Sequence, residues 1–299
     1  MIDPIPSGTR DVLPDELREL RAITDAMRDV FAAREYGEVA TPALEYETVL
    51  TRGDSAAADP AYRLFDEHGN VLVLRSDMTI PIARVVATRY STAPIPLRFS
   101  YIAHAYRAVK QHRGESREIL QAGIELVGAP GPEGTAEAVT VLCATLDAAG
   151  LTAYRVGLGD ARLFERALAR AGVDAAPVLP LLEARDFVGL ERAVPEELLR
   201  IARLRGGVEV LEGVEEAEPL RALHALLAPA AAERVIFDLG LVRTLGYYTG
   251  AVFEVYDPGM GEPLGGGGRY DDLCGRFGRP LPAVGFALGI DALHGAVAK

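Results

Sequence analysis

Strand patterns dominate both ends of this chain, and a block of helical patterns stands between them. Apolar residues alternate, as in half-buried strands, from 234 onward and at 39–45, 63–75, 96–107, 117–128 and 154–160. Residues 160–230 show helical spacing, repeated prolines and few β-branched residues. Runs of strands with grouped helices are typical of an α+β fold on an antiparallel sheet. We therefore expect a core domain of residues 1–159 and 231–299, with a helical insertion at 160–230.

Helix signals are clearest at three places. Residues 14–36 carry apolar residues at helical spacing, with Pro14 in the first turn and Gly37 as the stop. The Ala-rich stretch 136–149 predicts a second helix. At the start of the insertion, Asp160 is expected to cap a third helix, which closes at Gly172 and carries Leu163, Phe164, Ala167, Leu168 and Ala171.

The charge and hydropathy of the chain bear on its partners. A formal net charge of -12 weighs against nucleic-acid binding, which relies on Lys and Arg to neutralise phosphates, so we expect no tRNA partner. The sequence shows no basic-then-apolar leader and no apolar run near the roughly 20 residues that a membrane helix needs. We therefore expect a cytoplasmic protein without a membrane partner.

The two cysteines do not point to a special chemistry. Cys143 and Cys274 stand far apart, outside any CxxC pattern and away from a histidine cluster. Neither a disulfide framework nor a metal site is indicated by such isolated residues. We expect no metal and no cofactor.

A free amino acid presents an ammonium, a carboxylate and a side chain, so its binding site needs acidic acceptors together with cationic or amide donors. The segment LRSDMT at 74–79 offers Asp77 and Thr79, which would share one face of a strand. In a second interpretation, Asp77 caps a helix that starts near Thr79. Both interpretations stay open on the residues alone.

The segment QAGIE at 121–125 also places two polar residues an even number of positions apart, as on one face of a strand. Gln121 and Glu125 fall on one face of a strand, and Gly123 between them permits close approach of a ligand or of backbone. Taken alone, the pair would more simply be a solvated strand face.

Two further segments are rich in tyrosine and glycine. Tyr247 and Tyr248, in LVRTLGYYTGAVFE at 241–254, would by themselves be ordinary strand aromatics. The segment GGGGRYDDL at 265–273 lacks the Lys-Ser/Thr ending of a P-loop and the spacing of a dinucleotide fingerprint. The residues alone therefore predict a tight turn between strands here.

Taken in this order, the four segments resemble the motifs of the histidyl-tRNA synthetase family, over almost the whole chain and least in the insertion. The resemblance implies the class II aminoacyl-tRNA synthetase catalytic fold, an antiparallel sheet with flanking helices. The family usually has Glu at position 77 and a carboxylate where this chain has Gly246. The resemblance also implies a histidine pocket made by Asp77, Thr79, Arg107, Gln121, Glu125, Arg243, Tyr247, Tyr248 and Tyr270.

The nucleotide half of the family pattern is incomplete in this chain. Within YRAVKQHRGESRE at 106–118, Arg107 matches the motif 2 arginine, but Val109 replaces a glutamate and Glu115 replaces a later arginine. In the last motif, Ala292 replaces the motif 3 arginine. Activation of an amino acid needs cations around the phosphates of ATP, so we expect this degraded nucleotide site to hold no catalytic residue. Two basic residues of the loop are available for another anion or are simply solvated: Lys110 and Arg113.

A histidine pocket without its nucleotide site resembles the family of regulatory subunits of ATP phosphoribosyltransferase, which serves the first step of histidine biosynthesis. This resemblance implies a non-catalytic subunit with L-histidine as feedback ligand. It further implies a self-dimer of synthetase type and a hetero-octamer with the short-form catalytic subunit. We also expect no anticodon-binding domain after the last motif.

Two other functions stay open on the sequence. One is a truncated or divergent histidyl-tRNA synthetase catalytic domain that forms histidyl-adenylate. The other is a free-standing histidine sensor with a different partner.

Overall fold

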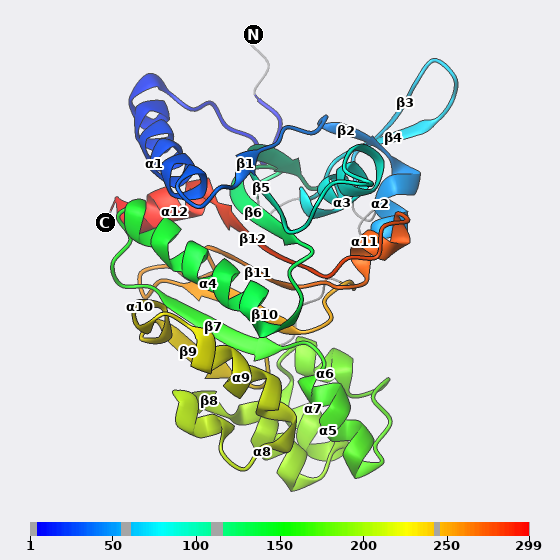
Figure 1. Cartoon of the computed structure of the whole chain (residues 1–299), viewed down its shortest axis with the longest axis vertical. Helices are drawn as coiled ribbons and strands as arrows, with labels where there is room; N and C mark the ends of the chain where they lie inside the picture. The colour runs from blue at the N-terminus through cyan, green and yellow to red at the C-terminus, as the bar shows by residue number, and fades with distance from the viewer. Residues whose placement is uncertain (1–4, 55–60, 109–115, 242–245, 299) are drawn as a thin grey trace.

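The computed structural model describes residues 5–54, 61–108, 116–241 and 246–298. Within them a nine-stranded sheet forms the centre of the molecule (Figure 1). Most neighbouring strands are antiparallel, as predicted, whereas the β1–β5 and β7–β9 pairs are parallel. The strand order is β1 (Gly37–Glu38), β5 (Leu97–Tyr106), β6 (Glu118–Val127), β12 (Ala283–Gly289), β11 (Gly265–Arg269), β10 (Ala251–Tyr256), β7 (Arg155–Asp160), β9 (Val235–Asp238) and β8 (Arg205–Gly206).

Helices cover the two faces of the sheet differently (Figure 1). One face packs on the long helices α1 (Pro14–Ala32) and α4 (Gly131–Ala148) and on α12 (Ile290–Val297). The other face, which we call the more open face, contacts mostly shorter elements. These elements are α2 (Glu47–Gly53), α3 (Thr79–Arg89), α11 (Leu273–Arg276) and a small sheet of β2 (Leu44–Tyr46), β4 (Val71–Leu74) and β3 (Arg63–Phe65).

Alternation along the strands sorts side chains between these faces. Ile124, Phe286 and Phe253 stand opposite one another across the sheet and join the α1–α4 core. Their sequence neighbours, including Glu125 on β6, point to the more open face. The predicted strands at 96–107, 117–128 and 154–160 and the hairpin within 63–75 are confirmed.

The insertion lies beyond β7 and β9 at one end of the sheet (Figure 1). It is not wholly helical as predicted, because β8 pairs with β9 and extends the sheet by one strand. Its apolar residues belong to the same core as β7 and β9, so the boundaries of a separate domain stay a prediction. The helices are α5 (Leu163–Ala171), α6 (Leu179–Glu183), α7 (Phe187–Ala193), α8 (Glu196–Arg203), α9 (Glu218–Leu226) and α10 (Pro229–Ala232), with 3-10 turns at Val208–Leu211 and Glu215–Ala217.

Element ends differ from the predicted ones for local reasons. The helix predicted over 14–36 ends at Ala32, and the chain reverses through Glu35 with a positive φ of 63° before Gly37 enters β1. Of the predicted strand 39–45, only residues 44 and 45 are in a strand, at the start of β2. Strand β1 ends just before the predicted range, at Glu38. The helix predicted at 136–149 begins earlier, at Gly131.

At the predicted start of the insertion, the N-cap residue of α5 is Arg162 and no side chain caps the helix, so the predicted cap by Asp160 is wrong. Asp160 accepts a hydrogen bond from the backbone N–H of Arg162 at 2.8 Å, just before α5, and Gly172 closes that helix with a φ of 68°. Ala171 is exposed rather than buried, because it lies past the inward stripe of the helix. In the part of the chain that the structure describes, no helix has the length and apolar character needed to cross a membrane.

Candidate amino-acid-binding site

A cavity of 360 Å³ lies on the more open face of the sheet, above β6, β12, β11 and β10. We call it the amino-acid cavity. The structure brings together around it most of the residues that the sequence singled out, from segments far apart in the chain. Those that line it are Asp77, Thr79, Arg107, Gln121, Tyr247, Tyr248 and Tyr270. Arg243 lies outside the described residues.

Glycine builds the floor of the amino-acid cavity. The four glycines at 265–268 form strand β11, so the prediction of a tight turn there is wrong. Most of these positions need glycine because a larger residue would collide with its neighbours: a Cβ atom at Gly268 would lie 2.8 Å from the ring of Tyr248. On the neighbouring strand, a Cβ atom at Gly285 would lie 1.8 Å from Oε2 of Glu125. The glycines therefore make the space into which the polar side chains of the site fold.

Glu125 does not itself line the amino-acid cavity: it is buried, with 1 % of its surface exposed, and contacts Thr79 and Tyr270, which do line it. The hydroxyl of Thr79 donates to Oε1 at 2.6 Å, and the hydroxyl of Tyr270 donates to Oε2. Burial raises the pKa of Glu125 to about 8, although both hydrogen bonds lower it. The interpretation of 121–125 as a solvated strand face is thus wrong, and Glu125 holds a proton at neutral pH.

Asp77 has a double role. Its Oδ1 accepts a hydrogen bond from the backbone N–H of Ile80 at 2.9 Å, in the first turn of α3. The strand predicted around Asp77 and Thr79 is therefore wrong, and the helix-capping interpretation is correct. Asp77 nevertheless also lines the amino-acid cavity. Burial raises its pKa, while the positive charge of Arg107 acts in the opposite direction.

Three tyrosines form an aromatic wall. The ring centroids of Tyr247 and Tyr248 lie 5.1 Å apart, and those of Tyr247 and Tyr270 lie 5.7 Å apart. Tyr247 and Tyr248 precede β10, so they are not strand aromatics. Burial raises the pKa of Tyr247 and of Tyr270, which keeps both hydroxyls protonated as donors.

Hydrogen bonds connect the segments that carry these tyrosines to each other and to the end of α2. The backbone N–H of Thr249 donates to the carbonyl of Arg269 at 2.8 Å, and the N–H of Asp271 donates to Oγ1 of Thr249 at 2.8 Å. At the other end, the N–H of Gly246 donates to Asp54 at 3.2 Å. The aromatic wall is therefore held by backbone contacts from both sides.

Gln121 supplies a buried polar atom without a partner. The residue is 9 % exposed, and its Oε1 has no hydrogen-bond partner among the described residues. Buried polar atoms are nearly always paired in folded proteins. An unpaired acceptor that lines a cavity indicates a ligand N–H or O–H donor.

Several residues of the site were missed by the sequence analysis. Tyr101, Glu254 and Glu262 line the amino-acid cavity, and Asp54 supports the tyrosine segment from α2. Glu254 stands opposite Gly266 in the β10–β11 register. Only that register could have revealed it, because strand pairing is not readable from local sequence.

The nucleotide side of the site is represented by Ala292, which lines the amino-acid cavity at the start of α12. The other predicted nucleotide-site residues lie outside the described residues, namely Val109, Glu115, Lys110 and Arg113. Among the described residues, three acidic side chains line the cavity against one arginine: Asp77, Glu254 and Glu262 against Arg107. The described ranges contain no group of three or more His, Cys, Asp or Glu that could hold a metal ion.

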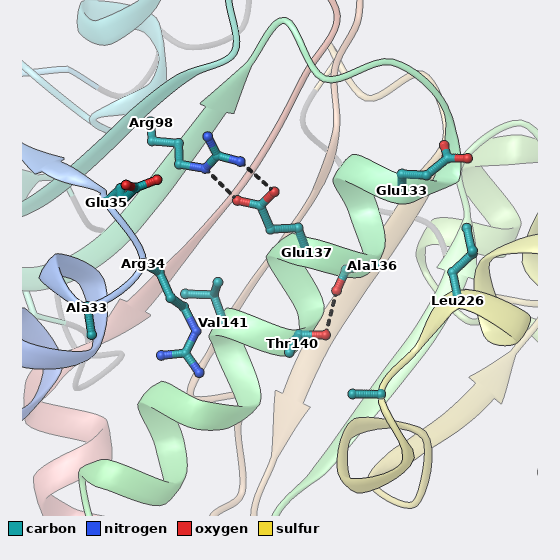
Figure 2. A pocket seen from close by; sticks show the side chains of 11 residues that line it. Ala33, Arg34, Glu35, Arg98, Glu133, Ala136, Glu137, Thr140, Val141 and Leu226 are labelled. Carbon is teal, nitrogen blue, oxygen red and sulfur yellow. Dashed lines mark hydrogen bonds and ion pairs between the residues drawn. The ribbon is translucent and has the colours of Figure 1, made fainter.

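A larger groove of 680 Å³ lies on the α1–α4 face of the sheet (Figure 2). Arg98 donates to both carboxylate oxygens of Glu137, at 2.8 and 3.0 Å, and the hydroxyl of Tyr36 donates to the same carboxylate at 2.8 Å. We call it the α1–α4 groove. Its central charges are satisfied within the protein, so size alone does not make it the candidate site.

Comparisons with known proteins agree with this geometry. A sequence model of the histidyl-tRNA synthetase family matches residues 8–293. An ATP phosphoribosyltransferase regulatory subunit from Symbiobacterium thermophilum is 43 % identical, over 97 % of this chain and 78 % of that protein. A protein of the same name from Moorella thermoacetica is 38 % identical, over 97 % of this chain and 80 % of its own length.

A solved structure matches as well. It is described as an ATP phosphoribosyltransferase regulatory subunit/histidyl-tRNA synthetase from Bacillus halodurans, with a TM-score of 0.92 and 32 % sequence identity. The match covers 99 % of this chain and 84 % of that one. The fold is therefore the class II synthetase fold that the sequence predicted.

Proposed function

The chain belongs to the family of ATP phosphoribosyltransferase regulatory subunits, which share the fold of histidyl-tRNA synthetases, and from this premise we propose that it regulates ATP phosphoribosyltransferase without being a synthetase. In this role it is required for the first step of L-histidine biosynthesis and makes that step sensitive to histidine. It assembles with the short-form catalytic subunit, as a dimer within a hetero-octamer of four chains of each kind. It acts in the cytoplasm, and tRNA is not a partner.

We propose that L-histidine occupies the amino-acid cavity. Asp77 is suited to accept hydrogen bonds from the ligand ammonium, and the free Oε1 of Gln121 supplies a further acceptor. The ring wall of Tyr247, Tyr248 and Tyr270 suits a flat imidazole. Arg243, which the family resemblance places near the ligand carboxylate, completes the proposed set.

The charge of the amino-acid cavity carries the non-catalytic part of the proposal. ATP brings several negative charges, and its activation needs arginines and magnesium around the phosphates. The described lining offers Arg107 against Asp77, Glu254 and Glu262, and Ala292 stands where synthetases have the motif 3 arginine. One such donor contributes roughly 3 kcal/mol to transition-state stabilisation in comparable sites. We therefore expect amino-acid binding without adenylation.

Histidine can regulate the assembly only if it binds two states of that assembly with different affinities. A buried cavity closed by segments of several elements fits this requirement, because any shift of those segments changes the cavity. The catalytic subunit would favour one arrangement and histidine the other.

The test is co-expression of the chain with a short-form catalytic subunit, followed by sizing chromatography and an ATP phosphoribosyltransferase assay with and without L-histidine. We expect a complex whose activity depends on this chain and falls with histidine. Absence of a complex would favour a free-standing histidine sensor. In parallel, histidine-dependent exchange of labelled pyrophosphate into ATP by the pure chain would support a divergent histidyl-tRNA synthetase instead.

A further inference from the structure

A second cavity, of 540 Å³, lies on the same face of the sheet, where the helical insertion meets β7, β9 and β10. We call it the insertion cavity. Its volume falls within the roughly 300–1,000 Å³ of small-molecule sites. Glu254, Glu262 and Pro263 line both this cavity and the amino-acid cavity, so the two are immediate neighbours.

One end of the insertion cavity is positively charged. It contains Arg185 and Arg205, against one buried carboxylate, Asp238. Arg205 pairs with Asp238 across the β8–β9 register, and its Nε donates to Oδ2 at 3.0 Å. Arg185 approaches the same oxygen at 3.5 Å. Asp238 thus orders two guanidinium groups but neutralises only part of the positive charge of this end.

The other end carries carboxylates. Glu254 on β10 and the following residues Asp257 and Glu262 line it. The floor between the two ends is uncharged, since Gly157 and Ile236 follow Glu254 in register across β7 and β9. Arg155 on β7 stands opposite Tyr256 on β10, so it lies on the carboxylate side. The insertion cavity therefore has two arginines against Asp238 at the β8–β9 end, and three carboxylates against one arginine at the β10 end.

The backbone at Arg185 has an unusual conformation. Arg185 has a positive φ of 52°, and the N–H of Asp186 donates to the carbonyl of Leu181 at 2.9 Å, which closes helix α6. Glycine is the usual residue at this position of a helix end, and another residue is strained there. A glycine would close the helix equally well. The side chain of Arg185 extends toward Asp238, a contact that glycine could not make.

We propose that the insertion cavity is a second ligand site, which binds a small zwitterion of amino-acid or dipeptide size. The ligand carboxylate would face Arg185 and Arg205, and its ammonium would face Glu254, Asp257 and Glu262. A simple anion such as phosphate is opposed by the three carboxylates, and a simple cation by the arginines. This proposal goes beyond histidine binding in the neighbouring cavity and does not depend on it.

The test is ligand-observed NMR on the purified full-length chain, with the twenty amino acids and their glycyl dipeptides as probes. Each binding probe is measured again as its methyl ester, which lacks the carboxylate, and as its N-acetyl form, which lacks the ammonium. We expect at least one probe to bind, with a loss of about tenfold or more for each derivative and for Arg185→Gly. Thermal unfolding shows that the variant is folded.

Glu35→Gly is the matched control, because Glu35 is the other non-glycine residue with positive φ in the described ranges and lines the α1–α4 groove instead. It should relieve the same kind of strain and leave probe binding unchanged. Three results would overturn the proposal: no probe binds, the binding probes are indifferent to Arg185→Gly, or inorganic phosphate binds as tightly as any zwitterion. Loss of complex formation with the catalytic subunit would instead concern only the proposed function.

Discussion

The amino-acid cavity and the α1–α4 groove lie on opposite faces of one sheet, and the carboxylate next to each has a different set of hydrogen-bond donors. In the groove, the carboxylate of Glu137 receives two hydrogen bonds from Arg98 (Figure 2). Tyr36 donates a third. Next to the amino-acid cavity, Glu125 receives hydroxyl donors from Thr79 and Tyr270, which line it. The groove is the larger of the two, at 680 Å³ against 360 Å³.

The pKa values of Glu137 and Glu125 shift in opposite directions. Burial raises the pKa of both groups, but the hydrogen bonds of Arg98 and Tyr36 win at Glu137 and leave its pKa lowered. At Glu125 burial wins, and the pKa rises to about 8. The amino-acid cavity also contains the Oε1 atom of Gln121, a buried acceptor without a hydrogen-bond partner among the described residues. Unmet hydrogen-bonding capacity, rather than volume, distinguishes the binding site from the groove.

The largest effect is expected when the glycine floor is filled. Gly285→Ala places a Cβ atom where Oε2 of Glu125 now lies, so Glu125 must move or the strand must shift. We expect histidine affinity to fall by about 100-fold or more and the free energy of unfolding to fall by about 1–3 kcal/mol. Titration calorimetry and urea unfolding measure the two effects.

Gly261→Ala is the control for this change, because nothing lies within 4 Å of a Cβ atom at that position. It should leave affinity and stability unaltered. A folded Gly285→Ala protein that keeps wild-type histidine affinity would show that the ligand does not use the amino-acid cavity.

The next effect concerns the proton on Glu125. Because its folded pKa is about 8 and its unfolded value is near 4.5, the folded state binds more protons between these values, and stability falls as pH rises through that window. Glu125→Gln removes this loss. We expect the variant to be more stable than wild type at pH 9, by on the order of 3 kcal/mol, and to differ little at pH 5.

Urea unfolding of both proteins across this pH range is the measurement. Parallel stability curves for wild type and Glu125→Gln would mean that Glu125 is ionised in the folded protein. The neutral, proton-holding carboxyl described above would then be wrong.

A smaller effect separates binding from stability at Gln121. Gln121→Leu removes a buried acceptor that has no partner in the described protein, so the free energy of unfolding of the ligand-free protein should rise by up to about 1 kcal/mol. Histidine affinity should fall about tenfold, because the ligand loses an acceptor. Urea unfolding should therefore show a higher free energy of unfolding, whereas calorimetry should show a lower affinity for histidine.

Thr140→Val in the α1–α4 groove is the matched control. The hydroxyl of Thr140 already donates to the carbonyl of Ala136 at 2.7 Å (Figure 2), so its loss should leave histidine affinity unchanged. A loss of stability in Gln121→Leu without loss of affinity would assign Gln121 a structural role.

How far the sequence predicted this site depends on the kind of information each residue needs. The strands that carry Gln121 and Glu125 were predictable, because alternation with period two is a local property. The sequence predicts a turn at the glycines 265–268, because the conformational freedom of glycine suits tight turns. Their actual role is to leave room for side chains of other segments, such as Tyr248 over Gly268. That role appears only when strands from distant parts of the chain are placed side by side.

Asp77 and Glu254 show the same limit. The helix cap by Asp77 was among the predicted alternatives because capping is local, but its place in the cavity wall came only from the family resemblance. Glu254 was missed because its place depends on the register between β10 and β11.

The smallest effect is expected in the α1–α4 groove. Glu137→Gln weakens the pair with Arg98, which is partly exposed, so the free energy of unfolding at pH 7 should fall by less than about 1 kcal/mol. Because the folded pKa of Glu137 is lowered, its stabilisation is present at neutral pH and is lost as pH falls through the folded pKa. The stability curves of variant and wild type should therefore converge in acid, whereas those of Glu125→Gln and wild type separate in base. Urea unfolding across the pH range tests both signs, and calorimetry should show unchanged histidine affinity for Glu137→Gln. A clear change in that affinity would mean that the two faces of the sheet are coupled, and the groove would then belong to the regulatory path rather than contrast with it.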